Sequence, residues 1–214
     1  MNRGSRHISR TKPLLASCLL MILMSGWWLW VSAQSASFSA PHDLARWAGA
    51  AEMSSIFSEP WRLVSSTVLH LHLEHLVFNA LFVTILAAGH AIQTTNRETL
   101  CIYFLSGAGG TLAGCAMQHG LFLGASGAMF GLLGANIVAM RNRVNKVELT
   151  LTACVALALT WLNPGDLNAH IAGLFLGCVL EFLGLARSRR FAWLFIVVCM
   201  LALSLAVTHM VSES

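Results

Sequence analysis

Four polar side chains that could perform acyl-transfer chemistry stand in otherwise apolar stretches of the sequence. Ser126 lies within "GASG", and His170 lies within "GDLNAHIAGLFLG". His75 and Asn79 are four residues apart in "LHLHLEHLVFNALF". A serine hydroxyl becomes a good nucleophile when a base accepts its proton, and neutral histidine is such a base near pH 7. These residues raise the hypothesis of a Ser126–His170 dyad that works without a carboxylate.

The same stretches supply donors for the oxyanion that acyl transfer creates. The Asn79 amide, the His75 imidazole and the Ser126 backbone N–H, at a helix N-terminus, could all donate to it. Gly124 would let the preceding loop approach a substrate carbonyl without a Cβ in the way.

Composition places these residues in a membrane protein. Of the 214 residues, 57% are hydrophobic and only 10% are charged, and the mean hydropathy is +0.70. A helix needs about 20 apolar residues to cross a bilayer core. The sequence therefore predicts an all-α, polytopic helical bundle with seven spans, near 14–32, 66–90, 99–118, 123–140, 147–162, 167–185 and 191–208.

The basic residues predict the orientation of these spans. With the N-terminus inside, eleven of the thirteen Lys and Arg residues fall on the inner side, and only Arg46 and Arg62 fall outside. Basic residues collect on the cytoplasmic side of membrane proteins. The predicted topology is N-in and C-out, in a bacterial inner (cell) membrane, with the polar residues near the outer face. This bias explains the net charge of +4, so no nucleic-acid partner is expected.

Helical geometry predicts which polar residues meet. His75 and Asn79 share one helix face, whereas His70 would point away from that face if it were helical. A helix starting about four residues before His75 would place His75 about 6 Å deep and Asn79 about 12 Å deep. Ser126 and His170 would lie about 6–8 Å deep. We therefore expect one outward-facing pocket, in which peptide bonds are hydrolysed within the membrane.

Glycines predict how the dyad is brought together. Gly127 and Gly131 are four residues apart on one span, and Gly173 and Gly177 repeat this spacing on another. Pairs of small residues at this spacing allow membrane helices to touch. His170 precedes Gly173 by three residues and so shares its face. The glycines alone would indicate only packing, but with the dyad they indicate a Ser/His contact.

The chain divides into three predicted parts: a basic cytoplasmic N-terminus (1–13), a six-helix domain with a long outer loop near 34–65 (14–190), and an additional C-terminal helix with a short tail (191–214). The six cysteines are scattered and contain no C-x-x-C pair. They are typical of apolar filler, so we expect neither a disulfide nor a metal, and no cofactor.

Two other classes of membrane protein are less consistent with the sequence. A metal or haem protein could use the histidines of "HLHLEH", but this segment has neither the H-E-x-x-H nor the H-x-x-E-H zinc spacing. A transporter would be expected to show internal repeats and acidic residues at mid-membrane. We find neither pattern.

Five segments resemble the rhomboid family of intramembrane serine proteases, in the same order and in the matching spans: "EPWR", "HLHLEHLVFN", "YFLSGAGG", "GASGAMFG" and "AHIAGLFLG". The resemblance implies that Ser126 is the nucleophile, that His170 is the base, and that His75, Asn79 and the Ser126 backbone form the oxyanion site. It also implies a structural role for His70 and for Trp61-Arg62, a six-helix core with one added helix, and transmembrane proteins as substrates.

Two positions depart from the family pattern. Gln93 stands where many relatives have Glu, which would loosen a contact at the inner face. Phe130 stands where some members have Tyr; its ring could still stack on His170 but could not donate a hydrogen bond. The alternative function is a catalytically inactive rhomboid-like factor that binds membrane proteins.

Overall fold

The structure is a computed structural model that describes residues 14–118, 120–140 and 167–212. Its helical elements, in chain order, are α1 (Leu15–Gln34), the 3₁₀ turn η1 (Ser35–Ser37), α2 (Pro41–Trp47), α3 (Arg62–Ser65), α4 (Leu73–Gln93), α5 (Asn96–Met117), α6 (Ser126–Met140), α8 (Leu167–Leu183), the 3₁₀ turn η3 (Leu185–Arg187) and α9 (Arg189–Ser212).

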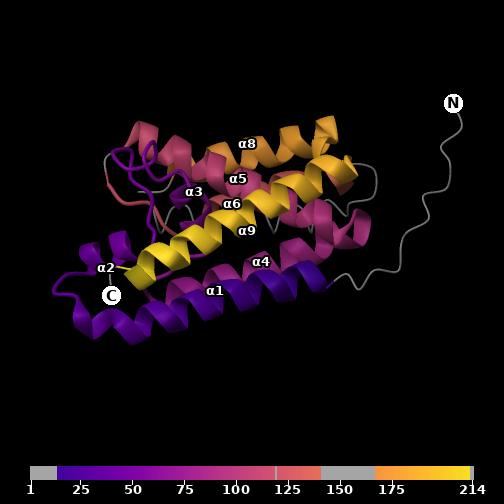
Figure 1. The fold of residues 1–214 in the computed structure, drawn as a ribbon. Coiled ribbons are helices and arrows are strands. Elements are labelled where there is room, and N and C mark those ends of the chain that lie inside the picture. The colour runs from indigo at the N-terminus through magenta and orange to yellow at the C-terminus, as the bar shows by residue number, and fades with distance from the viewer. Residues whose placement is uncertain (1–13, 119, 141–166, 213–214) are drawn as a thin grey trace, which may run out of the picture.

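Long apolar helices confirm the predicted membrane bundle. The first helix with its 3₁₀ extension, α4, α5 and α9 are each long and apolar enough to cross a membrane, and α6 and α8 are shorter apolar helices. These six helices coincide with six predicted spans, whereas the predicted span 147–162 lies outside the described residues. The chain is thus a multi-pass integral membrane protein. Figure 1 shows α1 and α4 side by side and α9 running obliquely across the bundle, with its C-terminal end beside α2.

One helix begins later than the sequence predicts. The predicted span starts at 66, and the depths expected for His75 and Asn79 favour a start about four residues before His75; α4 starts at Leu73, after an extended His72. In a helix the Ser66 carbonyl would accept from the amide four residues on. Here it accepts instead from the Gly124 amide at 2.8 Å. The Thr67 carbonyl accepts from the Tyr103 hydroxyl at 2.8 Å. Tertiary hydrogen bonds thus take the place of helical ones at the Ser66 and Thr67 carbonyls.

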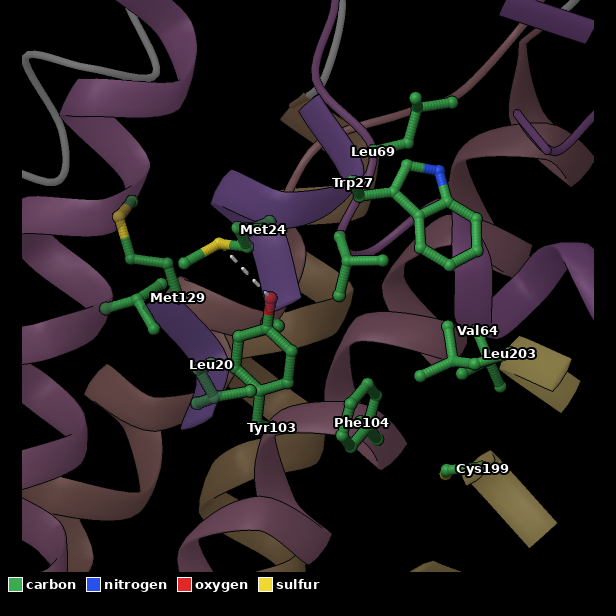
Figure 2. Packing of buried hydrophobic residues seen from close by; sticks show 14 of the residues in the cluster. Leu20, Met24, Trp27, Val64, Leu69, Tyr103, Phe104, Met129, Cys199 and Leu203 are labelled. Carbon is green, nitrogen blue, oxygen red and sulfur yellow. Dashed lines mark hydrogen bonds between the residues drawn. The ribbon is translucent and has the colours of Figure 1, made fainter. Parts of the chain in front are cut away.

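Tyr103 on α5 lies at the centre of the apolar core. Its side chain is fully buried, and Figure 2 shows its hydroxyl directed toward Met24 of α1, whose sulfur lies 3.8 Å away. Phe104, beside it, packs edge-on against the Tyr103 ring. The same cluster includes Val64 of α3 and Leu203 of α9. The core therefore joins α1, α3, α5 and α9 around one buried phenol.

Glycines bring α6 and α8 into backbone contact. A Cβ on Gly173 would overlap the carbonyl oxygen of Gly127, and a Cβ on Gly177 would overlap that of Gly131. The predicted glycine faces thus lie against each other. Helix α5 joins them, because a Cβ on its Gly110 would lie 3.5 Å from the Gly127 Cα. Close packing at this three-helix junction fixes the positions of the helices that carry the polar residues.

A buried polar network joins the C-terminal ends of α4 and α8. His90 is completely buried, and its Nδ1 lies 2.9 Å from Thr99 Oγ1 and 3.0 Å from Thr94 Oγ1. Its Nε2 lies 3.5 Å from a carboxylate oxygen of Glu181. The other Glu181 oxygen accepts from Arg187 at 2.6 Å. Glu181 therefore has a structural role here, at the end of α8 far from His170.

Candidate active site

The first turns of α4, α6 and α8 lie together at one end of the bundle, which we call the site end. Ser126 is the first residue of α6 and is partly exposed. Its backbone amide belongs to the first turn, whose N–H groups have no partner within the helix and carry the positive end of the helix dipole. The arrangement makes the start of α6 suited to an oxyanion.

His170 lies on the side of α6 that carries Ser126. The imidazole is 3% exposed and stacks on the ring of Phe130, with 4.5 Å between ring centroids and 13° between planes. Phe130 is one turn after Ser126 on the same helix face. In addition, a Cβ on Gly127 would lie 3.6 Å from the carbonyl oxygen of Ala169. The residues next to Ser126 and His170 therefore leave room for no more than a methyl group between them.

His75 and Asn79 lie on α4 directly beside the loop that leads to Ser126. Gly124 has a φ of +116°, in the region that L side chains rarely adopt. A Cβ at this position would lie 2.9 Å from Cε1 of His75 and 3.9 Å from Nδ2 of Asn79. Only glycine allows the loop to pass so close to both side chains in this conformation.

His70 is not helical, so the condition under which it would point away from His75 and Asn79 is not met. Because α4 starts only at Leu73, His70 lies in the preceding loop and points back toward α4. Its Nε2 lies 3.0 Å from Nδ2 of Asn79, and its ring centroid lies 5.1 Å from that of His75. Two features of the sequence could have indicated this position of His70. It lies five residues before His75, and it belongs to a segment that resembles a rhomboid motif.

The contacts of His70 define its protonation state. Nδ1 lies 3.1 Å from the Val68 carbonyl, which only accepts, so Nδ1 carries a proton. The Ala125 amide donates to Nε2 at 3.4 Å, so Nε2 is an acceptor. Burial, and then the neighbouring His75, lower the pKa of His70 to about 4, so the ring is neutral at pH 7. Since Nε2 accepts, Asn79 must direct its NH₂ group toward His70.

Backbone hydrogen bonds fix the loop that precedes Ser126. The Gly124 amide donates to the Ser66 carbonyl at 2.8 Å. Phe122 and Ala51 exchange two backbone hydrogen bonds, of 2.8 and 2.9 Å, in an antiparallel β-bridge. The segment 122–125 is therefore held from three sides, by residue 51, by residues 66–70 and by α4.

The structure thus brings Ser126, His170, His75 and Asn79 to the site end, with Gly124, Gly127, Gly131 and Gly173 in the contacts between their elements. Among the described residues, no group of three or more His, Cys, Asp or Glu side chains could hold a metal ion. The available chemistry is that of a hydroxyl, an imidazole and directed N–H donors.

Known proteins share this sequence pattern. A family model of the Rhomboid domain matches residues 58–187. The rhomboid protease GluP of Bacillus subtilis (strain 168) is 34% identical over 154 residues, which make up 67% of this chain and 30% of GluP. YdcA of the same bacterium is 30% identical over 62% of this chain and 71% of its own length. RHOMBOID-like protein 2 of Arabidopsis thaliana is 33% identical over 68% of this chain and 49% of its own length. The chain therefore spans about a third of GluP and about half of the plant protein.

Proposed function

Because this chain belongs to the rhomboid family, we propose that it is an intramembrane serine protease that hydrolyses peptide bonds in transmembrane or membrane-proximal segments of membrane proteins. The observation that carries the proposal is the junction of α6 and α8. There Phe130, one turn after Ser126, stacks on the buried His170, while His75 and Asn79 lie against Gly124.

The proposed reaction proceeds through an ester on Ser126. The Ser126 oxygen adds to the substrate carbonyl while His170 takes the hydroxyl proton. The C–N bond then breaks, and His170 gives the proton to the leaving amine. A water molecule, deprotonated by His170, hydrolyses the ester, and the proton returns to the Ser126 oxygen. Glu181 is not a third member of this dyad, since it pairs with His90 and Arg187 instead.

The proposed oxyanion site uses the orientation of Asn79. The amide nitrogen of Asn79 carries two N–H groups, and the bond to His70 uses one of them. The second is available to a substrate oxyanion, together with His75 and the Ser126 backbone N–H. In this account His70 and the Ala125 amide are positioning groups that hold the donors before substrate arrives.

The topology that accompanies this function is also a proposal. Seven spans, the seventh being 147–162, would place the N-terminus inside and the site end outside, in a bacterial inner membrane. Residues 14–190 would form the six-helix catalytic domain, α9 the additional helix, and residues 1–13 a cytoplasmic segment. Water would reach Ser126 from the outer side, and the substrate would come from the surrounding lipid.

Reconstitution with a model substrate tests the function. Purified protein in vesicles is mixed with a single-span protein whose helix contains Gly and Pro near one membrane face, and the products are analysed by mass spectrometry. We expect cleavage at one peptide bond within or beside the span, and no cleavage of a matched span made of leucine. Stable binding of the substrate without cleavage would reject the protease and support the inactive binding factor.

Replacing Asn79 by alanine removes one proposed oxyanion donor and leaves the dyad intact. We expect kcat to fall by about 10²–10³, with little change in KM because the interaction forms mainly in the transition state. Asn168→Ala is the matched control, since Asn168 lies in the first turn of α8 but two residues from His170 and so on another face. Steady-state turnover of the model substrate measures both. Equal rates for Asn79→Ala and the parent would remove Asn79 from the mechanism.

A further inference from the structure

The C-terminal turn of α9 is bonded to the segment that connects α1 with α4. The Trp47 indole N–H donates to the Met210 carbonyl at 3.1 Å, across 163 positions of the chain. One residue earlier, His209 faces Glu59 and Arg62. We call these five residues, Trp47, Glu59, Arg62, His209 and Met210, the α9 clamp.

Arg62 is the centre of the α9 clamp. It is 6% exposed, and its Nε donates to Glu59 at 2.8 Å. Its Nη1 donates to the carbonyl oxygens of Arg46 and Ala50, at 2.6 and 3.1 Å. A buried guanidinium with these partners fixes the segment around it, because it ties the Arg46 and Ala50 carbonyls and the Glu59 carboxylate to one charged group.

His209 completes this arrangement from α9. Its Nε2 lies 3.4 Å from Nη2 of Arg62. A guanidinium only donates, so Nε2 accepts and Nδ1 carries the proton. Nδ1 lies 3.8 Å from Glu59, and the imidazole ring lies 5.2 Å from the Trp61 ring. The same ring thus faces the arginine with one nitrogen and the carboxylate with the other.

Two short routes lead from the α9 clamp to Ser126. Along the first, Arg62 binds the Ala50 carbonyl, and the next residue, Ala51, forms the β-bridge to Phe122. Along the second, Arg62 begins α3, and the residue after α3, Ser66, holds the Gly124 amide. The first route ends at Phe122 and the second at Gly124, which precede Ser126 by four and by two positions.

We propose that the C-terminal turn of α9 positions the loop that carries Ser126, with His209 as a positioning residue that acts through Arg62. The effect on turnover rests on the proposed protease function, whereas the effect on the loop does not. Helix α9 would then be part of the catalytic unit, although its large apolar side chains are mostly exposed on the lipid side. The contact on which the proposal depends is the one that the last turn of α9 makes with Trp47 and Arg62.

The test compares His209→Ala with His209→Gln and with Thr208→Ala. Glutamine keeps an acceptor for Arg62 and a donor for Glu59. Thr208 is exposed, and its hydroxyl donates to the Ser204 carbonyl of the same helix at 2.6 Å. Thr208→Ala is therefore the matched control on the same turn.

A cavity of about 400 Å³ borders the α9 clamp and is lined by both Arg46 and Arg62. Water there can hydrate Arg62 after truncation, so the alanine variant should fold.

The first measurement is hydrogen exchange at the amides of residues 120–126, which needs no activity. We expect His209→Ala to accelerate exchange at Gly124 and Phe122 by about tenfold, and both His209→Gln and Thr208→Ala to stay near the parent. Trp47→Phe, which removes the indole N–H together with part of the buried ring, should accelerate the same amides. Unchanged exchange in His209→Ala and Trp47→Phe would overturn the proposal, as would equal acceleration in Thr208→Ala.

The second measurement is turnover of the model substrate. His209→Ala should lower kcat about tenfold or more with KM nearly unchanged, because a small displacement of the nucleophile affects the chemical step, and His209→Gln should restore it. Accelerated exchange with kcat unchanged would overturn the catalytic part of the proposal. If the parent protein itself shows no turnover, the proposed protease function fails, and the exchange data still decide whether α9 positions the loop.

Discussion

Replacing Ser126 by alanine is expected to lower peptide-bond hydrolysis by about 10³-fold or more, to below detection, while the bundle stays folded. The physical reason is that alanine has no oxygen to form the ester, and alanine fits where serine stood. Replacing His170 by alanine is expected to have an effect of similar size, because the hydroxyl then has no base.

The double variant gives a sharper test of the dyad. Residues that act as one unit show non-additive effects, so Ser126→Ala combined with His170→Ala should be no slower than either single variant. Ser58→Ala and His42→Ala are matched controls at exposed positions outside the site and should keep the parent rate. Full activity in either single variant, or a further large loss in the double variant, would contradict a Ser126–His170 mechanism.

Replacing Gly177 by alanine is expected to separate α6 from α8 and to remove both stability and activity. The added Cβ would overlap the Gly131 carbonyl oxygen and would lie 2.8 Å from the Gly131 Cα. These are backbone atoms, so no side chain can turn aside. Inserting a methyl group into such a contact costs about 1–3 kcal/mol or more, and any separation of the helices also moves His170 away from Ser126.

The control for this prediction is Gly26→Ala on α1. A Cβ there would have no atom within 4 Å, and alanine is a better helix former than glycine. Thermal unfolding in detergent should show a lower midpoint for Gly177→Ala and no loss for Gly26→Ala. Equal midpoints for Gly177→Ala and the parent would mean that the two helices do not touch along this face.

Much of the fold follows from local features of the sequence. The apolar segments predict the helices, and the four-residue spacing of Gly127 with Gly131 and of Gly173 with Gly177 predicts two faces that can touch. Both signals are local, because one helix turn brings these residues to one side. They were enough to expect Ser126 and His170 on facing helices. Their roles in catalysis remain predictions.

The sequence could not predict features that depend on distant contacts. Residues 66–72 adjoin a long apolar run that could extend as a helix, but the Ser66 and Thr67 carbonyls bond Gly124 and Tyr103 instead. For that reason His70 lies beside Asn79 rather than on another face. Similarly, nothing local to His209 or Trp47 indicates that α9 ends against the segment before α3. Such pairings become visible only once the helices have been packed.

Whether Ser126 is the nucleophile is tested most directly by identifying the residue that a serine-reactive fluorophosphonate labels in detergent. We expect mass spectrometry to find the probe on the Ser126 oxygen in the parent protein, and we expect Ser126→Ala and His170→Ala both to remove the label while Ser58→Ala keeps it. Labelling that survives Ser126→Ala, or a probe attached to another residue, would contradict the assignment of Ser126 as the nucleophile.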